Sequence, residues 1–239
     1  MTEILRVENL SISFGSNEVL KGLSFGLREN EVLGIIGPNG AGKTVLLNIL
    51  SGILSPTGGR IYFKGEDITR KSIVERTLMG FGRTFQVPRS FENMTTFENA
   101  LVGAAFGSNI AEKDALRISS EILDIIGLRK RKLDFARKLG LLDRKRLEIG
   151  IALASRPEIL LLDEVAGGLT ESELVDVLDI VRNVKDAGVS VIWIEHVLQT
   201  MLEGTDRVLL LAEGRDVVHG LPEEVMRSKE VEEIYLGVD

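Results

Sequence analysis

The stretch "GPNGAGKT", Gly37 to Thr44, decides the fold that this sequence predicts. It follows the apolar run "EVLGIIG" and opens the run "KTVLLNILSGI", so a strand, a tight loop and a helix come in that order. Glycines allow the backbone N–H groups of such a loop to point inward, and the start of the helix adds positive potential. The stretch therefore predicts a phosphate-binding loop.

Two side chains of this loop carry the chemistry of a bound nucleotide. Lys43 neutralises phosphate charge, and Thr44 offers its hydroxyl to Mg²⁺. The alternative, a glycine-rich turn with a chance lysine, is disfavoured by the strand-to-helix context. We predict that ATP contacts the loop and the next helical residue: Gly37, Pro38, Asn39, Gly40, Ala41, Gly42, Lys43, Thr44 and Val45.

A second apolar run, "EILLLDE", ends in two acids. An unpaired carboxylate at the end of a buried strand is costly, so Asp163 is predicted to bind the metal together with Thr44. Glu164 follows it and is predicted to act on a water in line with the γ-phosphate. An exposed acidic pair at a strand end is the alternative, and the phosphate-binding loop disfavours it.

Composition limits the class of protein. The chain has 239 residues, 44% of them hydrophobic and 27% charged, which suits one α/β domain with an insertion. No long apolar run and no basic-then-apolar leader are present, so we expect a cytoplasmic protein. A net charge of −7 disfavours a nucleic-acid surface. The segment "RKRK" at 129–132 is interpreted as a solvated helix or turn face rather than a nucleic-acid or lipid-headgroup patch.

The periodicity of the chain predicts its layers. Four short apolar runs, "EVLGIIG", "EILLLDE", "VSVIWIEH" and "DRVLLLAEG", are typical of a parallel sheet covered on both faces. The alternating segments "LSISF", "VLKGLSFGL" and "RIYFKGED" predict an antiparallel layer. A Thr-x-x-Glu capping box from Thr170 begins a helix that ends at Gly188. We expect a core at 1–87 and 155–220, a helical subdomain at 88–154 and a helical tail at 221–239.

The order of Phe14, "GPNGAGKT", Gln86 in "GRTFQ", "EILLLDE" and His196 in "VIWIEH" resembles the nucleotide-binding subunit of ABC transporters over nearly the whole chain. The resemblance implies a RecA-like P-loop NTPase fold and Mg²⁺-dependent ATP hydrolysis. It implies that Phe14 stacks on adenine and that His196 hydrogen-bonds the γ-phosphate. Gln86 would touch the metal and the attacking water, while its loop contacts the membrane partner. His219 has no such context and is interpreted as a turn residue.

Longer fragments, including "RTFQVPRSFENMTTFENALVG", "AGGLTESE" and the terminal "YLG", resemble ATPase subunits of branched-chain, or hydrophobic, amino-acid importers. This resemblance implies membrane permease subunits, an extracytoplasmic binding protein acting through them, and a second ATPase subunit. It places the chain on the inner face of the cell membrane. No nucleic-acid partner is expected.

One motif departs from the family. The helix before the Asp163 strand starts, in the family, with a Leu-Ser-x-Gly-Gln type signature that reaches the γ-phosphate of a partner subunit. The aligned residues here are Leu139, Gly140, Leu141, Leu142 and Asp143. Losing one preorganised donor typically costs about 3 kcal/mol, and a carboxylate about 6 Å from a phosphate adds roughly 3 kcal/mol per unit charge. We expect Asp143 to cap the helix in place of an anion.

The altered signature and the Val165 and "GGLT" departures that follow Glu164 favour an asymmetric pair, in which a different ATPase subunit lends a complete signature to this chain's site. Two alternatives stay open. The chain could be a regulatory nucleotide-binding subunit with little catalysis. It could also be a soluble ABC-type ATPase of DNA repair or translation, a class that predicts tandem cassettes, a coiled-coil insertion or basic arms.

Overall fold

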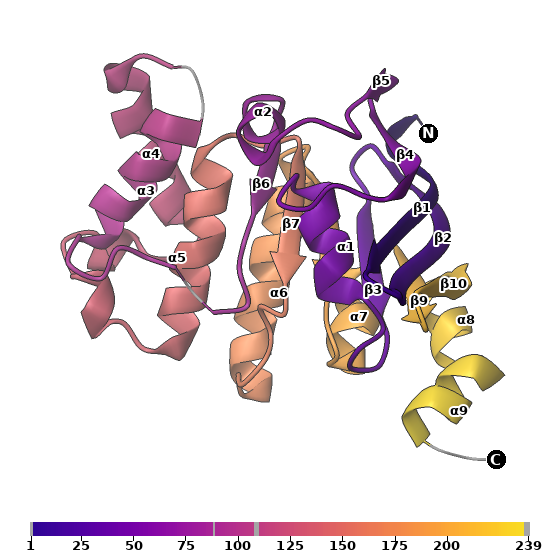
Figure 1. Cartoon of the computed structure of the whole chain (residues 1–239). Coiled ribbons are helices and arrows are strands. Elements are labelled where there is room, and N and C mark those ends of the chain that lie inside the picture. Colours follow the sequence, from indigo (N-terminus) through magenta and orange to yellow (C-terminus); the bar gives the residue numbers. More distant parts are fainter. Residues whose placement is uncertain (1, 88, 108–109, 237–239) are drawn as a thin grey trace.

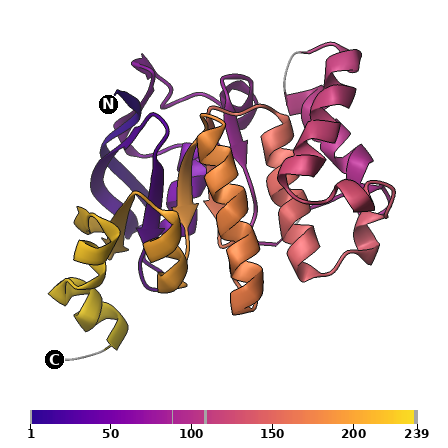
Figure 2. The same cartoon turned by 180° about the vertical axis from the view of Figure 1, so that it is seen from behind.

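The computed structural model describes residues 2–87, 89–107 and 110–236. Figure 1 shows a lobe that holds both sheets beside a lobe made of helices, and Figure 2 shows the same two lobes from behind. The predicted P-loop NTPase fold is confirmed, with its antiparallel layer and its group of inserted helices.

The first sheet is antiparallel and forms one outer layer. Its strand order is β2-β1-β4-β5. The bounds are Glu3–Phe14 for β1, Asn17–Arg28 for β2, Gly58–Phe63 for β4 and Glu66–Asp67 for β5. β1 alternates buried residues such as Leu10 and Ile12 with more exposed ones, which is the pattern of a sheet with one face toward the core.

The second sheet carries the predicted site. Its strand order is β10-β9-β3-β8-β7-β6, and β9, β3, β8, β7 and β6 pair in parallel. The bounds are Val32–Ile36 for β3, Phe81–Arg83 for β6, Ile159–Asp163 for β7, Ser190–Ile194 for β8, Arg207–Ala212 for β9 and Arg215–Gly220 for β10. Every residue of β3, β7 and β8 is buried, as expected of strands covered on both faces.

Two apolar cores lie on opposite faces of this parallel sheet. Helix α1, Lys43–Leu50, lies between the two sheets, and its Leu46 and Leu47 are fully buried there. On the other face, α6 (Glu171–Asp186) and α7 (Leu198–Gly204) pack on the sheet. The predicted capping box of α6 is present, because the Thr170 and Glu173 side chains each bond to the other's backbone N–H.

The helical lobe contains α3 (Thr96–Gly107), α4 (Glu112–Ile125) and α5 (Leu141–Ala154). Two short 3-10 turns, at Arg129–Arg131 and Ala136–Lys138, join α4 to α5. The "RKRK" segment is exposed there, as interpreted. The exact subdomain boundaries stay a prediction, and Pro88, the first residue of the predicted subdomain, lies outside the described residues.

Three short helices complete the fold. The helix α2, Ile73–Leu78, precedes β6. After β10 come α8, Pro222–Met226, and α9, Lys229–Leu236, which are helical as predicted for the tail; residues 237–239 lie outside the described part. Within the described residues, no helix combines the length and the apolar character needed to cross a bilayer.

The structure corrects the sequence analysis at two strands. β6 was not expected, because "FGR" is too short to show a period. β10 was also missed, and His219, interpreted as a turn residue, lies in this strand opposite Leu209. The turn before β10 is Glu213 and Gly214, both at positive φ, which suits a two-residue hairpin.

Candidate active site

The phosphate-binding loop connects the end of β3 to the start of α1, as predicted. Lys43 is the first residue of α1, and its Nζ donates to the carbonyls of Gly37 at 2.6 Å and Pro38 at 3.1 Å. Thr44 follows with an exposed side chain. The Lys43 side chain therefore turns back onto the loop that precedes it and ties the first residues of the loop to the start of α1.

Two glycines of the loop have no room for a side chain. A Cβ on Gly37 would lie 2.0 Å from the carbonyl oxygen of Leu211 in β9. A Cβ on Gly42, at φ +103°, would lie 2.8 Å from the side chain of Leu20 in β2. The loop thus packs closely between the two sheets, which requires glycine at both positions.

Lys43 and the acid pair share one electrostatic environment. Burial lowers the pKa of Lys43, and the negative charges of Glu164 and Asp163 act in the opposite direction. Lys43 is only 6% exposed, and the charges of both carboxylates act on its ammonium group. The structure therefore brings the loop and the ends of the strands together, as the sequence predicted.

Asp163 ends β7 in a buried position and is only partly satisfied. Its Oδ2 lies 3.4 Å from a guanidinium nitrogen of Arg83, while its Oδ1 is buried without a hydrogen-bond partner among the described atoms. Burial raises the pKa of Asp163, and the charge of Arg83 opposes that rise. Such an orphaned oxygen is the kind of atom that a metal ion or a metal-bound water satisfies.

Glu164 lies in a constrained turn directly after Asp163. Its φ is +49°, and its backbone N–H donates to the Ile194 carbonyl at 3.0 Å, so the turn is tied to the end of β8. Gln86 Nε2 donates to Glu164 Oε2 at 2.6 Å, and His196 Nδ1 lies 4.0 Å from the same oxygen. Gln86 and His196 therefore both lie beside the Glu164 carboxylate, so the three residues predicted to be catalytic are close together.

Two buried ionisable side chains hold the backbone of this turn. Lys145 of α5 donates from Nζ to the Glu164 carbonyl at 3.1 Å, and burial lowers the pKa of this lysine. Glu195 is fully buried, accepts a 2.5 Å hydrogen bond from the Ala166 N–H, and has its pKa raised by burial. The backbone of the turn that carries Glu164 is thus held by two buried side chains, Lys145 and Glu195.

The segment around Gln86 is fixed by another buried acid. Glu148 of α5 accepts from the Phe85 N–H at 3.2 Å and from the Arg89 N–H at 2.8 Å. Burial raises the pKa of Glu148, while these two hydrogen bonds act against the rise. A single carboxylate therefore holds the backbone on both sides of Gln86 and joins it to the helix that begins at the altered signature.

The structure corrects the predicted role of Asp143. α5 begins at Leu141 with Gly140 as its N-cap, and no side chain caps it, so Asp143 stands in the first turn as its third residue. Its carboxylate instead forms ion pairs with Arg131 at 3.1 Å and with Arg146 at 3.5 Å. These cations oppose the repulsion that we estimated for a phosphate, whereas the missing serine hydroxyl and glycine are not replaced.

Phe14 is the last residue of β1 and is half exposed. It borders the hairpin to β2, the strand that the end of the phosphate-binding loop packs against. Its stacking on adenine stays a prediction. An exposed aromatic ring at this place is nonetheless available to a ligand.

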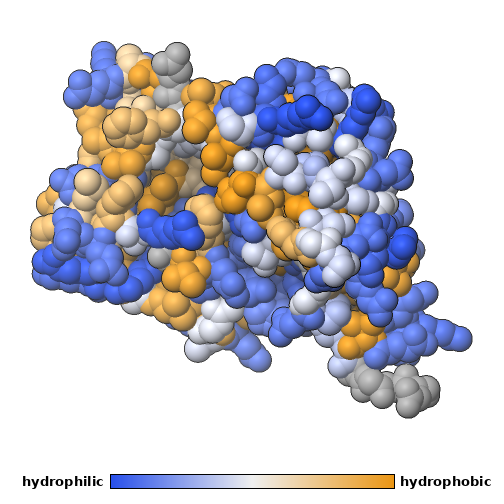
Figure 3. All heavy atoms as spheres, in the orientation of Figure 1, coloured by the Kyte–Doolittle hydropathy of each residue, from blue (hydrophilic) through white to orange (hydrophobic). Residues whose placement is uncertain are grey.

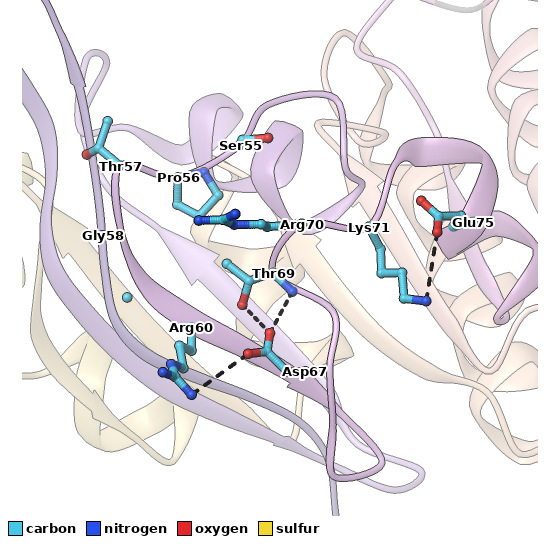
Figure 4. A pocket seen from close by; sticks show the side chains of 11 residues that line it. Ser55, Pro56, Thr57, Gly58, Arg60, Asp67, Thr69, Arg70, Lys71 and Glu75 are labelled. Carbon is cyan, nitrogen blue, oxygen red and sulfur yellow. Dashed lines mark hydrogen bonds and ion pairs between the residues drawn. The ribbon is translucent and has the colours of Figure 1, made fainter.

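A polar cavity of about 940 Å³ lies apart from these residues. It is formed by β4, β5 and the segment leading into α2, and Figure 4 shows the side chains that line it. Asp67 accepts from Thr69 and lies 4.0 Å from Arg60, and Lys71 lies 3.8 Å from Glu75. This cavity contains none of the predicted site residues.

Comparison with known proteins shows the family of this chain. The family model described as "ABC transporter" matches residues 20–167. The chain belongs to the ABC transporter family. It is 33% identical to the probable branched-chain amino acid transport ATP-binding protein LivG of Methanocaldococcus jannaschii, covering 98% of both chains. It is 29% identical to the lipopolysaccharide export system ATP-binding protein LptB of Haemophilus influenzae, covering 98% of this chain and 97% of that one.

Solved structures of ABC cassettes are also similar. The ADP conformation of MJ1267, an ATP-binding cassette of an ABC transporter, superimposes with a TM-score of 0.92 at 31% identity and full coverage of both chains. The chain is thus an ATP-binding and ATP-hydrolysing subunit of the ABC class. The predicted family is confirmed.

Four supporting residues, Arg83, Lys145, Glu148 and Glu195, were not singled out in the sequence. Arg83 lies in the quoted "GRTFQ" fragment, three residues before Gln86, and a cation so close to a predicted metal site could have been noticed. Glu148 and Glu195 are acids within apolar runs, which is unusual for buried segments. Their partners are backbone groups distant in sequence, so only the fold reveals their roles.

Proposed function

We propose that the loop from Gly37 to Val45 binds the phosphates of ATP and that the exposed ring of Phe14 stacks on adenine. The observation that carries this proposal is the convergence of Lys43, Asp163 and Glu164 at one end of the parallel sheet. Ligands of open α/β sheets bind at the carboxyl ends of the strands, which is where this loop and both acids lie.

The residues at this edge fit a Mg²⁺ ion. Asp163 offers a buried oxygen without a partner, Thr44 an exposed hydroxyl, and Gln86 a side-chain amide. These are hard oxygen ligands of the type that Mg²⁺ prefers, and the phosphates would supply others. A bound magnesium ion would neutralise charge that develops on the phosphate oxygens.

Hydrolysis would then depend on three side chains. Glu164 accepts a proton from the attacking water, and Gln86, which already bonds to Glu164, orients that water. His196 lies beside the same carboxylate and donates a hydrogen bond to the γ-phosphate. Lys43 stays on the phosphates through the reaction, and the products are ADP and inorganic phosphate.

The altered signature suits a pairing with a different ATPase subunit. Gly140 has no hydroxyl, and Leu142 occupies the place of the signature glycine. Leu141, at the exposed start of α5, adds an apolar side chain to the face that would meet the partner's nucleotide. Since this chain's own site keeps every residue type, the partner would supply the complete signature to it.

A membrane permease would dock at the border of the two lobes. A cavity of about 310 Å³ lies there, between α2, β6, α3 and α5, with Ile73, Phe85 and Phe106 among its lining residues. Phe106, which lines this cavity, is 82% exposed. Val74 and Val87, which are close in sequence to its lining residues Ile73 and Phe85, are 65% and 74% exposed. Figure 3 shows apolar side chains gathered on this side of the molecule. Exposed apolar area of this kind is typical of a contact with another protein. We infer that docking there holds the chain at the inner face of the membrane.

The cargo proposed is a branched-chain or other hydrophobic amino acid, delivered to the permease by an extracytoplasmic binding protein. The support is the similarity to the LivG proteins of Methanocaldococcus jannaschii and Salmonella typhimurium, at 33% and 32% identity. The similarity to LptB favours lipopolysaccharide export as a second candidate.

The test is to purify the complex through this chain from its native membrane. Co-purified permeases, reconstituted in vesicles with ATP inside, should take up leucine or isoleucine when this chain is wild type, and uptake should stop with Glu164→Gln. Unchanged turnover of the complex with that variant would mean that this chain's site is regulatory. Transport of lipopolysaccharide in place of amino acids would support the second candidate.

A further inference from the structure

The last described helix of the chain reaches the first residue of the phosphate-binding loop. The hydroxyl of Tyr235, in α9, accepts a hydrogen bond from the Gly37 N–H at 2.8 Å. The two residues are 198 positions apart in the sequence. α9 is held on the core by Val231, which is 4% exposed, and by the half-buried side chains of Ile234 and Tyr235.

This hydrogen bond completes the fixation of Gly37. The Gly37 carbonyl accepts from Lys43 Nζ at 2.6 Å, and its Cα lies so close to the Leu211 carbonyl that no side chain fits. With its N–H bonded to Tyr235 and its carbonyl bonded to Lys43, both backbone polar groups of Gly37 have partners. The orientation of the first peptide of the loop is therefore set jointly by β9, Lys43 and the C-terminal helix.

The hydroxyl is not easily replaced. Gly37 is buried, so water cannot readily replace a lost acceptor of its N–H, and a buried N–H without an acceptor is unfavourable. Burial also raises the pKa of Tyr235, so its hydroxyl stays neutral at physiological pH. Without the hydroxyl, the first peptide of the loop would rotate toward water or another acceptor and leave the geometry that a phosphate needs.

We propose that Tyr235 is a positioning residue for the phosphate-binding loop and that docking of α9 is thermodynamically linked to nucleotide binding. This inference rests on the proposed nucleotide site. By reciprocity, if docked α9 favours the loop geometry that binds phosphate, bound nucleotide must favour docked α9 to the same extent. The C-terminal helix is then part of the nucleotide site without touching the nucleotide.

The strength of the coupling between α9 docking and nucleotide binding can be estimated from one hydrogen bond. A net contribution of about 0.5–1.5 kcal/mol corresponds to a change of about two- to tenfold in a binding constant. Tyr235→Phe should therefore weaken MgADP binding by about that factor. The matched control is Tyr62→Phe, which removes the hydroxyl of the other tyrosine of the chain, in β4, and should leave the binding constant unchanged.

The experiment measures MgADP affinity by calorimetry and backbone hydrogen exchange of α9 with and without MgADP, on the full chain. In the wild type and in Tyr62→Phe, saturating MgADP should slow the exchange of the α9 amides. In Tyr235→Phe, this slowing should be lost and the affinity should fall. A purely structural tyrosine would change the exchange of α9 equally with and without nucleotide.

Two results would overturn the proposal: wild-type affinity in Tyr235→Phe, or exchange of α9 that does not respond to MgADP in the wild type. Lys43→Ala separates these from failure of the proposed site. If Lys43→Ala loses MgADP binding while Tyr235→Phe keeps it, only the link fails. If Lys43→Ala binds MgADP normally, the assignment of the nucleotide site itself is wrong, and the link falls with it.

Discussion

Gln86 and Glu164 meet across a hydrogen bond of 2.6 Å, although they follow different strands, β6 and β7. The bond joins a residue held by the helical lobe, through Glu148, to a residue held by the parallel sheet. Any movement of one lobe relative to the other would therefore change the geometry around the carboxylate that we assign as the base.

Replacing this carboxylate tests its chemical role. Glu164→Gln keeps the shape of the side chain but removes the proton acceptor, and loss of a general base typically slows a reaction by about 100-fold or more. We expect ATP hydrolysis by the assembled transporter to fall by that factor while MgATP affinity is retained. Phosphate release and calorimetry measure the two quantities. A matched change at an exposed acid, Glu121→Gln, should leave both as they are.

Glu148 is expected to act on the rate through the position of Gln86. A glutamine at this position offers one acceptor oxygen, so Glu148→Gln leaves either the Phe85 or the Arg89 N–H without its partner. We expect a fall of about tenfold in the turnover number, with a Michaelis constant for ATP near that of the wild type. If both constants stayed at wild-type values, the hold of Glu148 on this loop would have no catalytic importance.

The buried carboxyl of Glu195 predicts a pH dependence of stability. Its pKa is raised in the folded protein by burial, so the folded state binds its proton more readily than the unfolded state does. Its contribution to stability is therefore largest below the pKa of an ordinary glutamate and is lost as the pH rises through the raised value.

Glu195→Gln removes this titration. The free energy of unfolding of the variant is compared with that of the wild type by urea unfolding at several pH values. Relative to the wild type, it should increase as the pH rises from acid toward neutral, because only the wild type loses the contribution of the protonated carboxyl. A difference between the two proteins that stays constant with pH would show that Glu195 does not titrate in this range.

Arg76 predicts a large loss of stability. This residue is 1% exposed, and its guanidinium donates to five backbone carbonyls, those of Ile49, Leu50, Ile68, Thr69 and Lys71. Two of these carbonyls lie at the end of α1, where a cation is favourable, and burial lowers the pKa of Arg76 to about 10.

Arg76→Met should lower the free energy of unfolding by about 3 kcal/mol or more, because several buried carbonyls lose their donors. Urea unfolding measures this change. Arg129→Met, at a side chain that is 74% exposed, is the control and should lie within about 0.5 kcal/mol of the wild type. A similar small loss for Arg76→Met would mean that water replaces the guanidinium at these carbonyls.

The sequence predicted the parts of this molecule that depend on local pattern. The strand, loop and helix around Lys43, the acids that end β7, and the capping box at Thr170 each follow from neighbouring residues, and all are present. β10 shows why other parts were missed: its burial pattern is that of an exposed edge, and its identity as a strand depends on pairing with β9.

The residues that hold the site in place could not be predicted from the sequence, because their contacts also depend on tertiary structure. Asp143 was predicted to cap α5, but the first turn of the helix begins at Leu141, and Arg131 and Arg146 compete for the carboxylate. Arg131 belongs to a turn that only the fold brings to α5. Contacts such as Glu148 with Arg89 and Tyr235 with Gly37 likewise depend on tertiary structure.

The central claim is that this chain holds a complete ATP site but a defective signature. The most direct test is the ATPase rate of the purified chain alone, compared with that of the triple variant Gly140→Ser, Leu142→Gly and Asp143→Gln. A separate Lys43→Ala variant gives the background rate. We expect slow hydrolysis by the wild type and faster, cooperative hydrolysis by the triple variant, whose two copies can complete each other's sites. Rapid, cooperative hydrolysis by the wild-type chain alone would contradict the claim.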